Sequence, residues 1–330
     1  MHFGQRQIFA SAFLIFLLSL DTFAVAQSSS WRREWPHTDF SRHTVNLDEI
    51  QSGGPPKDGI PAIDAPRFEP AAVIKNLGPA EPVIALVIDG VAKAYPLRVL
   101  TWHEIANDTI GGVPVTVTYC PLCNASIVFD RRVDGRVLDF GVSGKLRHSD
   151  LIMYDRQTES WWQQFLGEAI VGGMTGTILK RLPARIMPFS EFESEFSHGL
   201  VLVPSNPRAK PYGENPYEAY DTSYRPFLYR GDYNGPIPAL AYVVAVNSDA
   251  WPLKDVRQAR RIENGNLVIT WTAGMNSALS ARQIKKGRDI GFVTVRRRNP
   301  DGTLVDIPHD VTFAFAFSAF HPQGLIHLSK

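Results

Sequence analysis

Two cysteines, Cys120 and Cys123, are the residues of this chain with the clearest potential for chemistry. They are the only cysteines among 330 residues and stand three apart in the stretch Tyr-Cys-Pro-Leu-Cys. Thiols at this spacing can close a small disulfide, cycle between thiol and disulfide, or supply two ligands to a metal ion. The pair therefore predicts a local site, and the three chemistries stay open at this point.

The residues around the pair bear on a metal site. A Cys-x-x-Cys that opens a helix has its first thiol activated by the helix dipole, but residues 124–129 resemble a strand. A turn between two strands is instead typical of a metal knuckle, which needs further ligands. The sequence has no second cysteine pair, so a histidine would complete the site. The metal hypothesis takes Cys120, Cys123 and His103 as ligands for copper or zinc, with Met153 or Met275 as a soft fourth ligand for copper.

The leading hypothesis is a periplasmic thiol–disulfide redox protein that exchanges through Cys120 and Cys123; the alternatives are the metal-binding protein and a non-catalytic binding module in which the pair is a structural disulfide. The redox hypothesis needs groups that stabilise a thiolate and hold a partner, but it needs no cofactor. His103 and Lys145 are the candidates that would tune the thiolate, with Arg131 as a further nearby cation. Residues 143–164 combine many hydrogen-bonding side chains with two tryptophans, which suits the floor of a polar pocket. The alternative is a pair of strands joined by a capped turn at residues 155–158. The predicted pocket residues are Asn124, Arg131, Ser143, Arg147, Asp155, Arg156, Ser160 and Trp162.

The N-terminus has the pattern of a secretory signal peptide. Arg6 precedes a short apolar run at residues 8–20, and Ala-Val-Ala ending at Ala26 is typical of a cleavage site. We therefore expect a periplasmic or secreted protein, with no membrane segment after cleavage near Ala26. The net charge of +1 gives no support to nucleic-acid binding. The expected partner is an unknown exported protein or a small molecule.

An internal similarity predicts the domain organisation. Residues 117–125 align with residues 269–277, which places Cys120 on Thr272 and Cys123 on Met275. The predicted fold is a β-dominated α+β fold, built from two pseudo-symmetric repeats of antiparallel strands with short helices. The predicted segments are a signal peptide (1–26), an extended N-terminal segment (27–80), repeat one with the Cys-x-x-Cys site (81–200), an irregular linker or lid (201–237), and a shorter repeat two without cysteines (238–330).

Local patterns predict the elements that position the cysteines. Alternating and β-branched residues predict strands before and after the pair, at 113–119 and 125–132. Pro96 is suited to a first helical turn and predicts a helix over residues 97–107. Further strands are predicted at 83–89, 91–95 and 136–140, a hairpin turn at 134–135, and a short helix at 188–198.

Several stretches together resemble the bacterial "domain of unknown function 3179" family. They lie at residues 58–64, 102–108, 119–123, 140–146, 153–160, 215–217 and 320–322, so the resemblance covers roughly 55–325. The resemblance implies an exported protein of unestablished activity. Some relatives are described as selenoproteins, and selenocysteine in place of a cysteine would favour redox work, because a structural disulfide gains nothing from it. Repeat two lacks much of the family's Asp-x-x-Thr-x-Ser-x-Trp stretch after Phe292.

Overall fold

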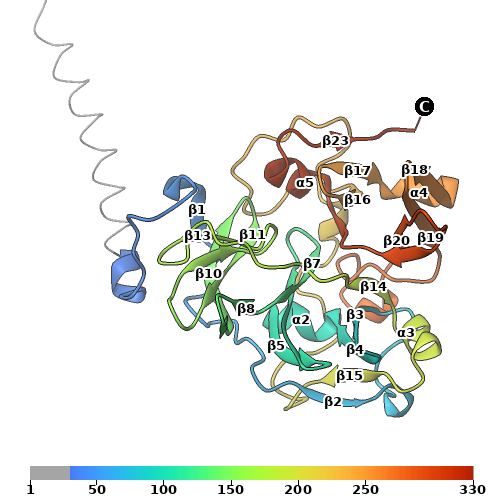
Figure 1. Cartoon of the computed structure of the whole chain (residues 1–330), viewed down its shortest axis with the longest axis horizontal. Helices are drawn as coiled ribbons and strands as arrows, with labels where there is room; N and C mark the ends of the chain where they lie inside the picture. Colours follow the sequence, from blue (N-terminus) through green and yellow to red (C-terminus); the bar gives the residue numbers. More distant parts are fainter. Residues whose placement is uncertain (1–29, 330) are drawn as a thin grey trace, which may run out of the picture.

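The computed structural model describes residues 30–329, and the predicted signal peptide lies outside this range. Strands make up 39% of the chain and helices 15%, which confirms a β-dominated fold. The described strands form five sheets of three to five strands and one two-stranded ribbon. The arrangement of the five sheets resembles a five-bladed β-propeller, with β7 near the centre of the view (Figure 1).

The sheet β1-β10-β11-β12-β13 carries the polar segment noted in the sequence. It packs against the N-terminal residues on the side of the molecule opposite the C-terminus (Figure 1). Trp31, Trp35 and Phe40 enclose Trp161 at ring-centroid distances of 5.2, 5.3 and 5.2 Å. The strands are β1 (Ile50–Ser52), β10 (Phe140–Arg147), β11 (Asp150–Asp155), β12 (Trp161–Gln163) and β13 (Glu168–Val171).

Two other sheets contain four strands in the same order and with the same directions, and the first of them has β2 as an additional edge strand. In β14-β3-β4-β15-β2, β3 pairs antiparallel with β14 and β4, and β15 runs parallel to β4. In β22-β16-β17-β23, β16 pairs antiparallel with β22 and β17, and β23 runs parallel to β17. The strands are β2 (Arg67–Pro70), β3 (Pro82–Ile88), β4 (Val91–Pro96), β14 (Arg185–Pro188), β15 (Leu200–Val203), β16 (Tyr242–Val246), β17 (Asp249–Pro252), β22 (Asp310–Phe313) and β23 (Leu325–Ile326).

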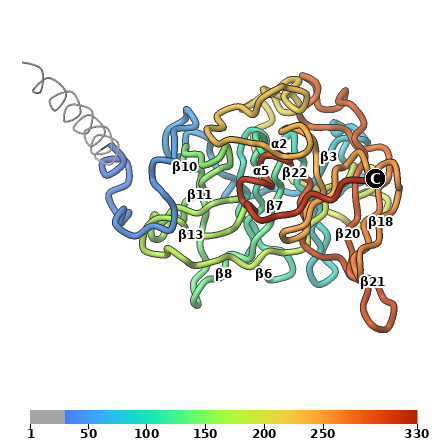
Figure 2. The backbone as a smooth tube through the Cα atoms, turned by 90° about the horizontal axis from the view of Figure 1, so that it is seen from above, coloured from blue at the N-terminus to red at the C-terminus, as the bar shows by residue number. Residues whose placement is uncertain are grey.

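The two remaining sheets and the two-stranded ribbon are antiparallel throughout. The sheet β5-β6-β7 carries the cysteines, and the sheet β18-β19-β20-β21 ends in a hairpin that projects from the body (Figure 2). The predicted turn at residues 134–135 joins the ribbon strands. The strands are β5 (Ile105–Ile110), β6 (Val113–Cys120), β7 (Ala125–Asp130), β8 (Arg132–Val133), β9 (Arg136–Val137), β18 (Arg261–Asn264), β19 (Leu267–Thr272), β20 (Phe292–Arg298) and β21 (Leu304–Asp306).

The helices are short, and one of them ends earlier than its sequence predicts. The helix expected over 97–107 stops at His103, because Glu104 has a φ of 58° and the chain turns into β5. The α-helices that lie wholly within residues 30–329 are α2 (Leu97–His103), α3 (Phe189–Glu195), α4 (Leu253–Ala259) and α5 (Ala314–Phe320). The 3₁₀ turns are η1 (Leu47–Glu49), η2 (Ala71–Val73), η3 (Tyr220–Thr222) and η4 (Ile284–Lys286).

Two repeats do not describe the whole molecule, and this part of the prediction is corrected to five sheets arranged like propeller blades. Within residues 30–329, strands of the first half form three of the five sheets and strands of the second half form two. Residues 277–282, which align behind the cysteine turn, form no strand. The alignment in sequence detects local hairpins, whereas the number of sheets depends on pairings between distant strands.

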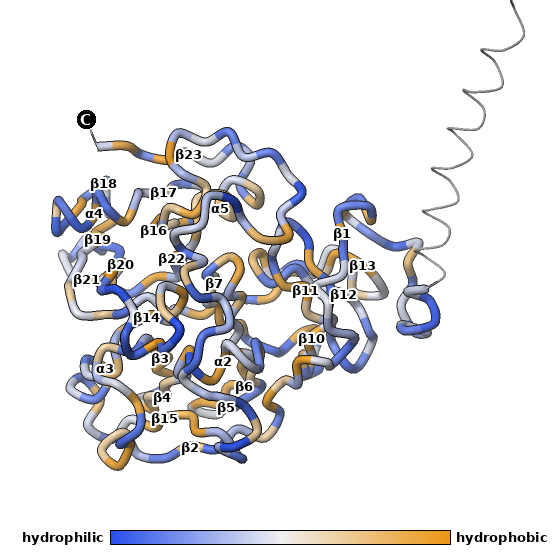
Figure 3. Tube along the Cα trace, turned by 180° about the vertical axis from the view of Figure 1, so that it is seen from behind, coloured by the Kyte–Doolittle hydropathy of each residue, from blue (hydrophilic) through white to orange (hydrophobic). Residues whose placement is uncertain are grey.

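Hydrophobic stretches run through the inner strands, including β3 and β7, and polar residues occupy most connections (Figure 3). One large hydrophobic cluster joins residues of both halves, and it includes Cys120, Cys123 and Trp251. The cysteines therefore sit in the main core. Among residues 30–329, no helix is long and apolar enough to cross a membrane.

Candidate functional site

A tight turn between β6 and β7 holds the two cysteines. Cys120 is the last residue of β6 and pairs with Ala125, the first residue of β7. The amide of Asn124 donates to the carbonyl of Pro121 at 3.2 Å, and Asn124 has a φ of 49°, a left-handed conformation that asparagine adopts more readily than most residues. Both cysteines are free thiols and are buried, at 2% and 0% exposure.

Asp150 lies beside the two thiols and comes from another sheet. It is the first residue of β11, directly after a turn in which His148 and Ser149 both have positive φ, at 53° and 66°. The Cys120 thiol donates to the carbonyl of Ser149 at 3.6 Å, which attaches this turn to the cysteine turn. The β10–β11 hairpin thus positions Asp150, and the contact depends on the packing of two sheets.

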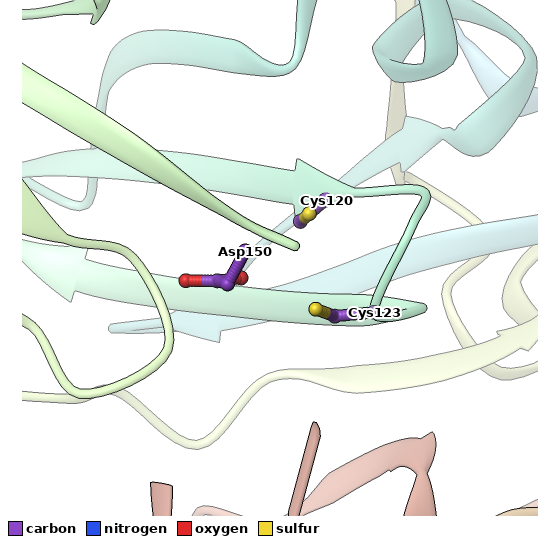
Figure 4. Close-up of side chains that lie close together, drawn as sticks. All are labelled: Cys120, Cys123 and Asp150. Carbon is purple, nitrogen blue, oxygen red and sulfur yellow. The ribbon is translucent and has the colours of Figure 1, made fainter. Parts of the chain in front are cut away.

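The three side chains form the only group of three or more histidine, cysteine, aspartate or glutamate residues within 30–329 that is arranged to hold a metal ion. Both sulfur atoms and a carboxylate oxygen of Asp150 lie within 4.8 Å of one another. Figure 4 shows Cys120 and Cys123 on the two arms of the turn and Asp150 next to them. Asp150 Oδ2 accepts hydrogen bonds from Gln163 Nε2 at 2.6 Å and from the Phe165 amide at 2.9 Å. Asp150 Oδ1 is buried and has no hydrogen-bond partner.

A second carboxyl group, that of Glu104, belongs to the same environment. Burial, followed by the charge of Asp150, raises the pKa of Glu104 to about 8, and burial raises the pKa of Asp150 to about 7. Burial also raises the pKa of Cys120, and that of Cys123 well above its usual range. None of the ion pairs between residues 30 and 329 involves Glu104 or Asp150. Four acidic groups are thus buried near one another without a cationic partner.

Residues from two later segments cover the cysteine turn. The Tyr220 hydroxyl donates to the carbonyl of Leu122 at 3.0 Å, and the Thr312 hydroxyl of β22 donates to the carbonyl of Cys123 at 2.7 Å. Ser149 Oγ donates to the carbonyl of Phe227 at 2.8 Å. Part of the predicted linker, 201–237, therefore lies over the thiols and over the turn that carries Asp150.

His103, Lys145 and Arg131 have their own partners away from the sulfur atoms. The two ring nitrogens of His103 bond to the carbonyl of Pro61 and to the Tyr212 hydroxyl, both at 2.7 Å. Lys145 Nζ donates to Glu34 Oε2 at 2.7 Å. Arg131 donates to the carbonyl of Leu138 at 2.8 Å and pairs with Asp139. None of the three stands with the thiols as the sequence suggested.

The predicted pocket residues mostly bond to one another or to the backbone. Asp155 accepts from the Thr158 amide at 2.6 Å and from Trp162 Nε1 at 2.9 Å, so residues 155–158 form a capped turn. Arg156 pairs with Asp64 at 3.0 Å. In the remaining contacts, Asn124 Nδ2 donates to the carbonyl of Val311, Ser143 Oγ to the carbonyl of Ile152, and Arg147 Nε to Glu49, while Ser160 Oγ accepts from the Met174 amide.

Sequence reasoning did not single out Asp150 or Glu104. Asp150 was one of many polar residues in 143–164, and Glu104 looked like a surface charge beside His103. No sequence signal marks Glu104, because the helix was expected to continue to residue 107 and its end is set by the positive φ of Glu104. No local pattern marks Asp150, since its contact with the cysteines joins two sheets.

Fold and site together define a β-dominated protein with a buried Cys-x-x-Cys and carboxylate cluster. The chain belongs to the family described as "Protein of unknown function (DUF3179)", whose model matches residues 57–324. This match confirms the resemblance seen in the sequence. No curated protein and no solved structure matches the chain.

Proposed function

We propose that the protein binds a divalent metal ion, for which zinc fits best, through Cys120, Cys123 and Asp150. The observation that carries this proposal is the Asp150 Oδ1 atom, which is buried and unbonded in a cluster with two sulfur atoms. A buried carboxylate oxygen without a partner is costly, because it loses its hydrogen bonds to water and gains none. A bound cation would supply the missing partner.

The charges around the cluster support the same proposal. Glu104 adds a second buried carboxyl group. Its charge adds to the raised pKa of Cys120, and the charge of Asp150 adds to its own raised pKa. Buried ionised groups need opposite charge, and the structure offers no lysine or arginine pairing to either carboxylate among residues 30–329. A divalent cation would compensate these groups once they are deprotonated. Glu104 is the candidate to approach the metal in addition to the three ligands.

The donor set favours zinc over copper. Thiolate and carboxylate donors are both common zinc ligands, and three protein ligands leave a fourth position for water or a further group. Copper(I) prefers sulfur and imidazole, and His103 is bonded elsewhere through both ring nitrogens. Asp150 thus replaces His103 in the ligand set that the sequence suggested. A metal ion bound here would serve either as a Lewis acid or as an ion that the protein carries.

Metal content of the purified protein tests the proposal. We expect a single zinc ion per chain in the unaltered protein after incubation with zinc and desalting, and loss of this ion in Cys120→Ser and Asp150→Asn. The matched control is His103→Ala, which should keep its zinc because His103 lies outside the proposed ligand set. Unaltered protein without stoichiometric zinc, or His103→Ala protein that loses it while folded by circular dichroism, would count against the proposal.

Thiol–disulfide exchange is the second candidate, and the free state of both adjacent thiols favours it. In this reaction the two thiols lose two electrons and two protons and form a disulfide, and a partner disulfide takes them up and becomes two thiols. Because burial keeps the cysteines protonated, Asp150 would accept the first proton. The reduction potential of metal-free protein separates the candidates: about −120 to −270 mV supports exchange, and below about −300 mV indicates a disulfide clip in a non-catalytic binding module.

We also propose that the protein is exported and works in the periplasm or outside the cell, as the N-terminal pattern suggests. Its partner would be an exported protein or a small molecule.

The common strand order of β14-β3-β4-β15 and β22-β16-β17-β23 further supports duplication of a single sheet, a smaller unit than the two repeats expected from the sequence.

A further inference from the structure

An open cavity of about 590 Å³ lies next to the turn that carries Asp150. Its walls come from residues 229–236 of the covering segment and from residues 318–326 after α5. Polar and aromatic side chains line it, and its ionisable members include one acid and one imidazole. The lining includes His148, Tyr229, Asp232 and Ser318.

The turn at residues 148–150 has the cavity on one side and the thiols on the other. His148 lines the cavity, whereas the next residue, Ser149, accepts the Cys120 thiol hydrogen bond through its carbonyl. Asp150 then lies with both sulfur atoms. One turn of chain therefore separates the solvent-connected cavity from the buried cluster.

Tyr229 lies where the cavity meets this turn, because it lines the cavity and its ring lies against His148. Burial is the main cause that raises the pKa of its hydroxyl, and the negative charges of Asp232 and Cys123 add to it. Its ring packs on Phe315 at 5.0 Å and on His148 at 6.2 Å between centroids. Among residues 30–329, no hydrogen bond holds its hydroxyl, so ring packing alone keeps Tyr229 in place.

The segment that carries Tyr229 is weakly attached to the body. Its neighbours Tyr224 and Phe227 are 90% and 60% exposed. Backbone attachments near Tyr229 are made by the carbonyls of Phe227 and Leu228, which accept from Ser149 and Gln51. Segments with few buried contacts open locally at low free-energy cost. Movement of Tyr229 would therefore not require unfolding of the core.

We propose that this cavity is the route by which a divalent cation reaches the Cys120–Cys123–Asp150 site, and that Tyr229 closes it. Asp232 and His148 offer a carboxylate and an imidazole to the incoming ion before it meets Asp150. The proposal rests on the proposed metal site, but the access route itself can be tested without metal. Tyr229 is a gating residue here and touches neither sulfur as a ligand.

Alkylation of the metal-free protein by iodoacetamide is the first test, since this small neutral reagent must reach the thiols. We expect Tyr229→Ala to be alkylated about tenfold faster than the unaltered protein, because it removes the closing ring from a local opening equilibrium. The matched control is Tyr224→Ala, a tyrosine of the same segment that lies outside the cavity lining, and its rate should not change. A cavity-filling variant, Ser318→Trp, should slow alkylation.

Zinc uptake is the second test. Asp232→Asn should slow zinc binding severalfold, since it removes the negative charge at the mouth of the cavity. It should leave the rate of iodoacetamide alkylation unchanged, because this reagent is neutral. Equal alkylation rates for Tyr229→Ala and Tyr224→Ala, or no effect of Ser318→Trp, would overturn the access route. Faster alkylation in Tyr229→Ala, together with absence of bound zinc in the unaltered protein, would support the route and reject the metal function.

Discussion

In metal-free protein, the contribution of Asp150 and Glu104 to the free energy of unfolding is expected to fall as the pH rises from about 4 to about 8, and zinc is expected to reverse this trend. Burial raises the pKa of Asp150 from 3.8 to about 7 and that of Glu104 from 4.5 to about 8. Between the ordinary and the raised values, the folded chain keeps both protons and the unfolded chain releases them. Folding then takes up protons, so the free energy of unfolding falls with pH across this window.

Zinc bound at the proposed site would act in the opposite direction, because it would bind the deprotonated groups. Its binding to the thiolates and to Asp150 releases protons, and it therefore strengthens as the pH rises. At a free zinc concentration of about a thousand times the dissociation constant, binding only to the folded state adds about 4 kcal/mol to the free energy of unfolding. The zinc-bound protein should therefore be more stable at about pH 8 than at about pH 6.

Urea denaturation at several pH values, with zinc or with a chelator, measures both effects. The reference variants are Asp150→Asn and Glu104→Gln, which lack one titrating carboxyl each, so the difference from the unaltered protein contains that carboxyl and its coupling to the other buried acids, while the contributions of uncoupled groups cancel. Each variant should show a shallower fall with pH when metal-free, and Asp150→Asn should gain little from zinc. In metal-free protein, the free energy of unfolding of the unaltered chain minus that of a variant should fall with pH. A difference that stays flat or rises with pH would contradict the raised pKa values of the buried acids.

The cysteine turn was predictable from the sequence because its determinants are local. Alternating β-branched residues before and after the pair predict two strands, and these are β6 and β7. The predicted hairpin at 83–95 and the helix at 188–198 are likewise found as β3–β4 and α3. In each case, a short run of residues contains both the periodic pattern and the turn signal.

The proposed ligand set was not predictable, because a single backbone angle and one long-range contact decide which side chains lie beside the cysteines. Extending the helix past Glu104 would keep His103 next to the cysteine strand, but the positive φ of Glu104 ends the helix and the chain reverses. The Glu104 carbonyl then accepts from the Tyr119 amide, so Glu104 is the residue placed near Cys120. Asp150 joins the site only when the β10–β11 hairpin packs on the cysteine sheet, and no pattern in either segment records that contact.

The β10–β11 hairpin that presents Asp150 depends on Gly144, and Gly144→Ala is expected to cost about 3 kcal/mol or more of unfolding free energy. Gly144 has a φ of +72° and lies where the pairing register of β10 with β11 shifts, between Val142 and Lys145. A Cβ atom there would come within 2.1 Å of the Pro55 carbonyl oxygen, a backbone atom with little freedom to move. Urea denaturation would measure the loss.

Gly90→Ala is the matched control for this variant. Gly90 has a φ of +79°, and a Cβ atom there meets nothing within 4 Å, so its substitution isolates the left-handed conformation, at about 1 to 2 kcal/mol. The excess cost at Gly144 then measures the contact with Pro55. Because Asp150 belongs to the same hairpin, the protein with Gly144→Ala should also bind zinc more weakly, whereas the protein with Gly90→Ala should bind it normally. Equal losses of stability in both variants would show that the approach of β10 to Pro55 does not hold the hairpin in place.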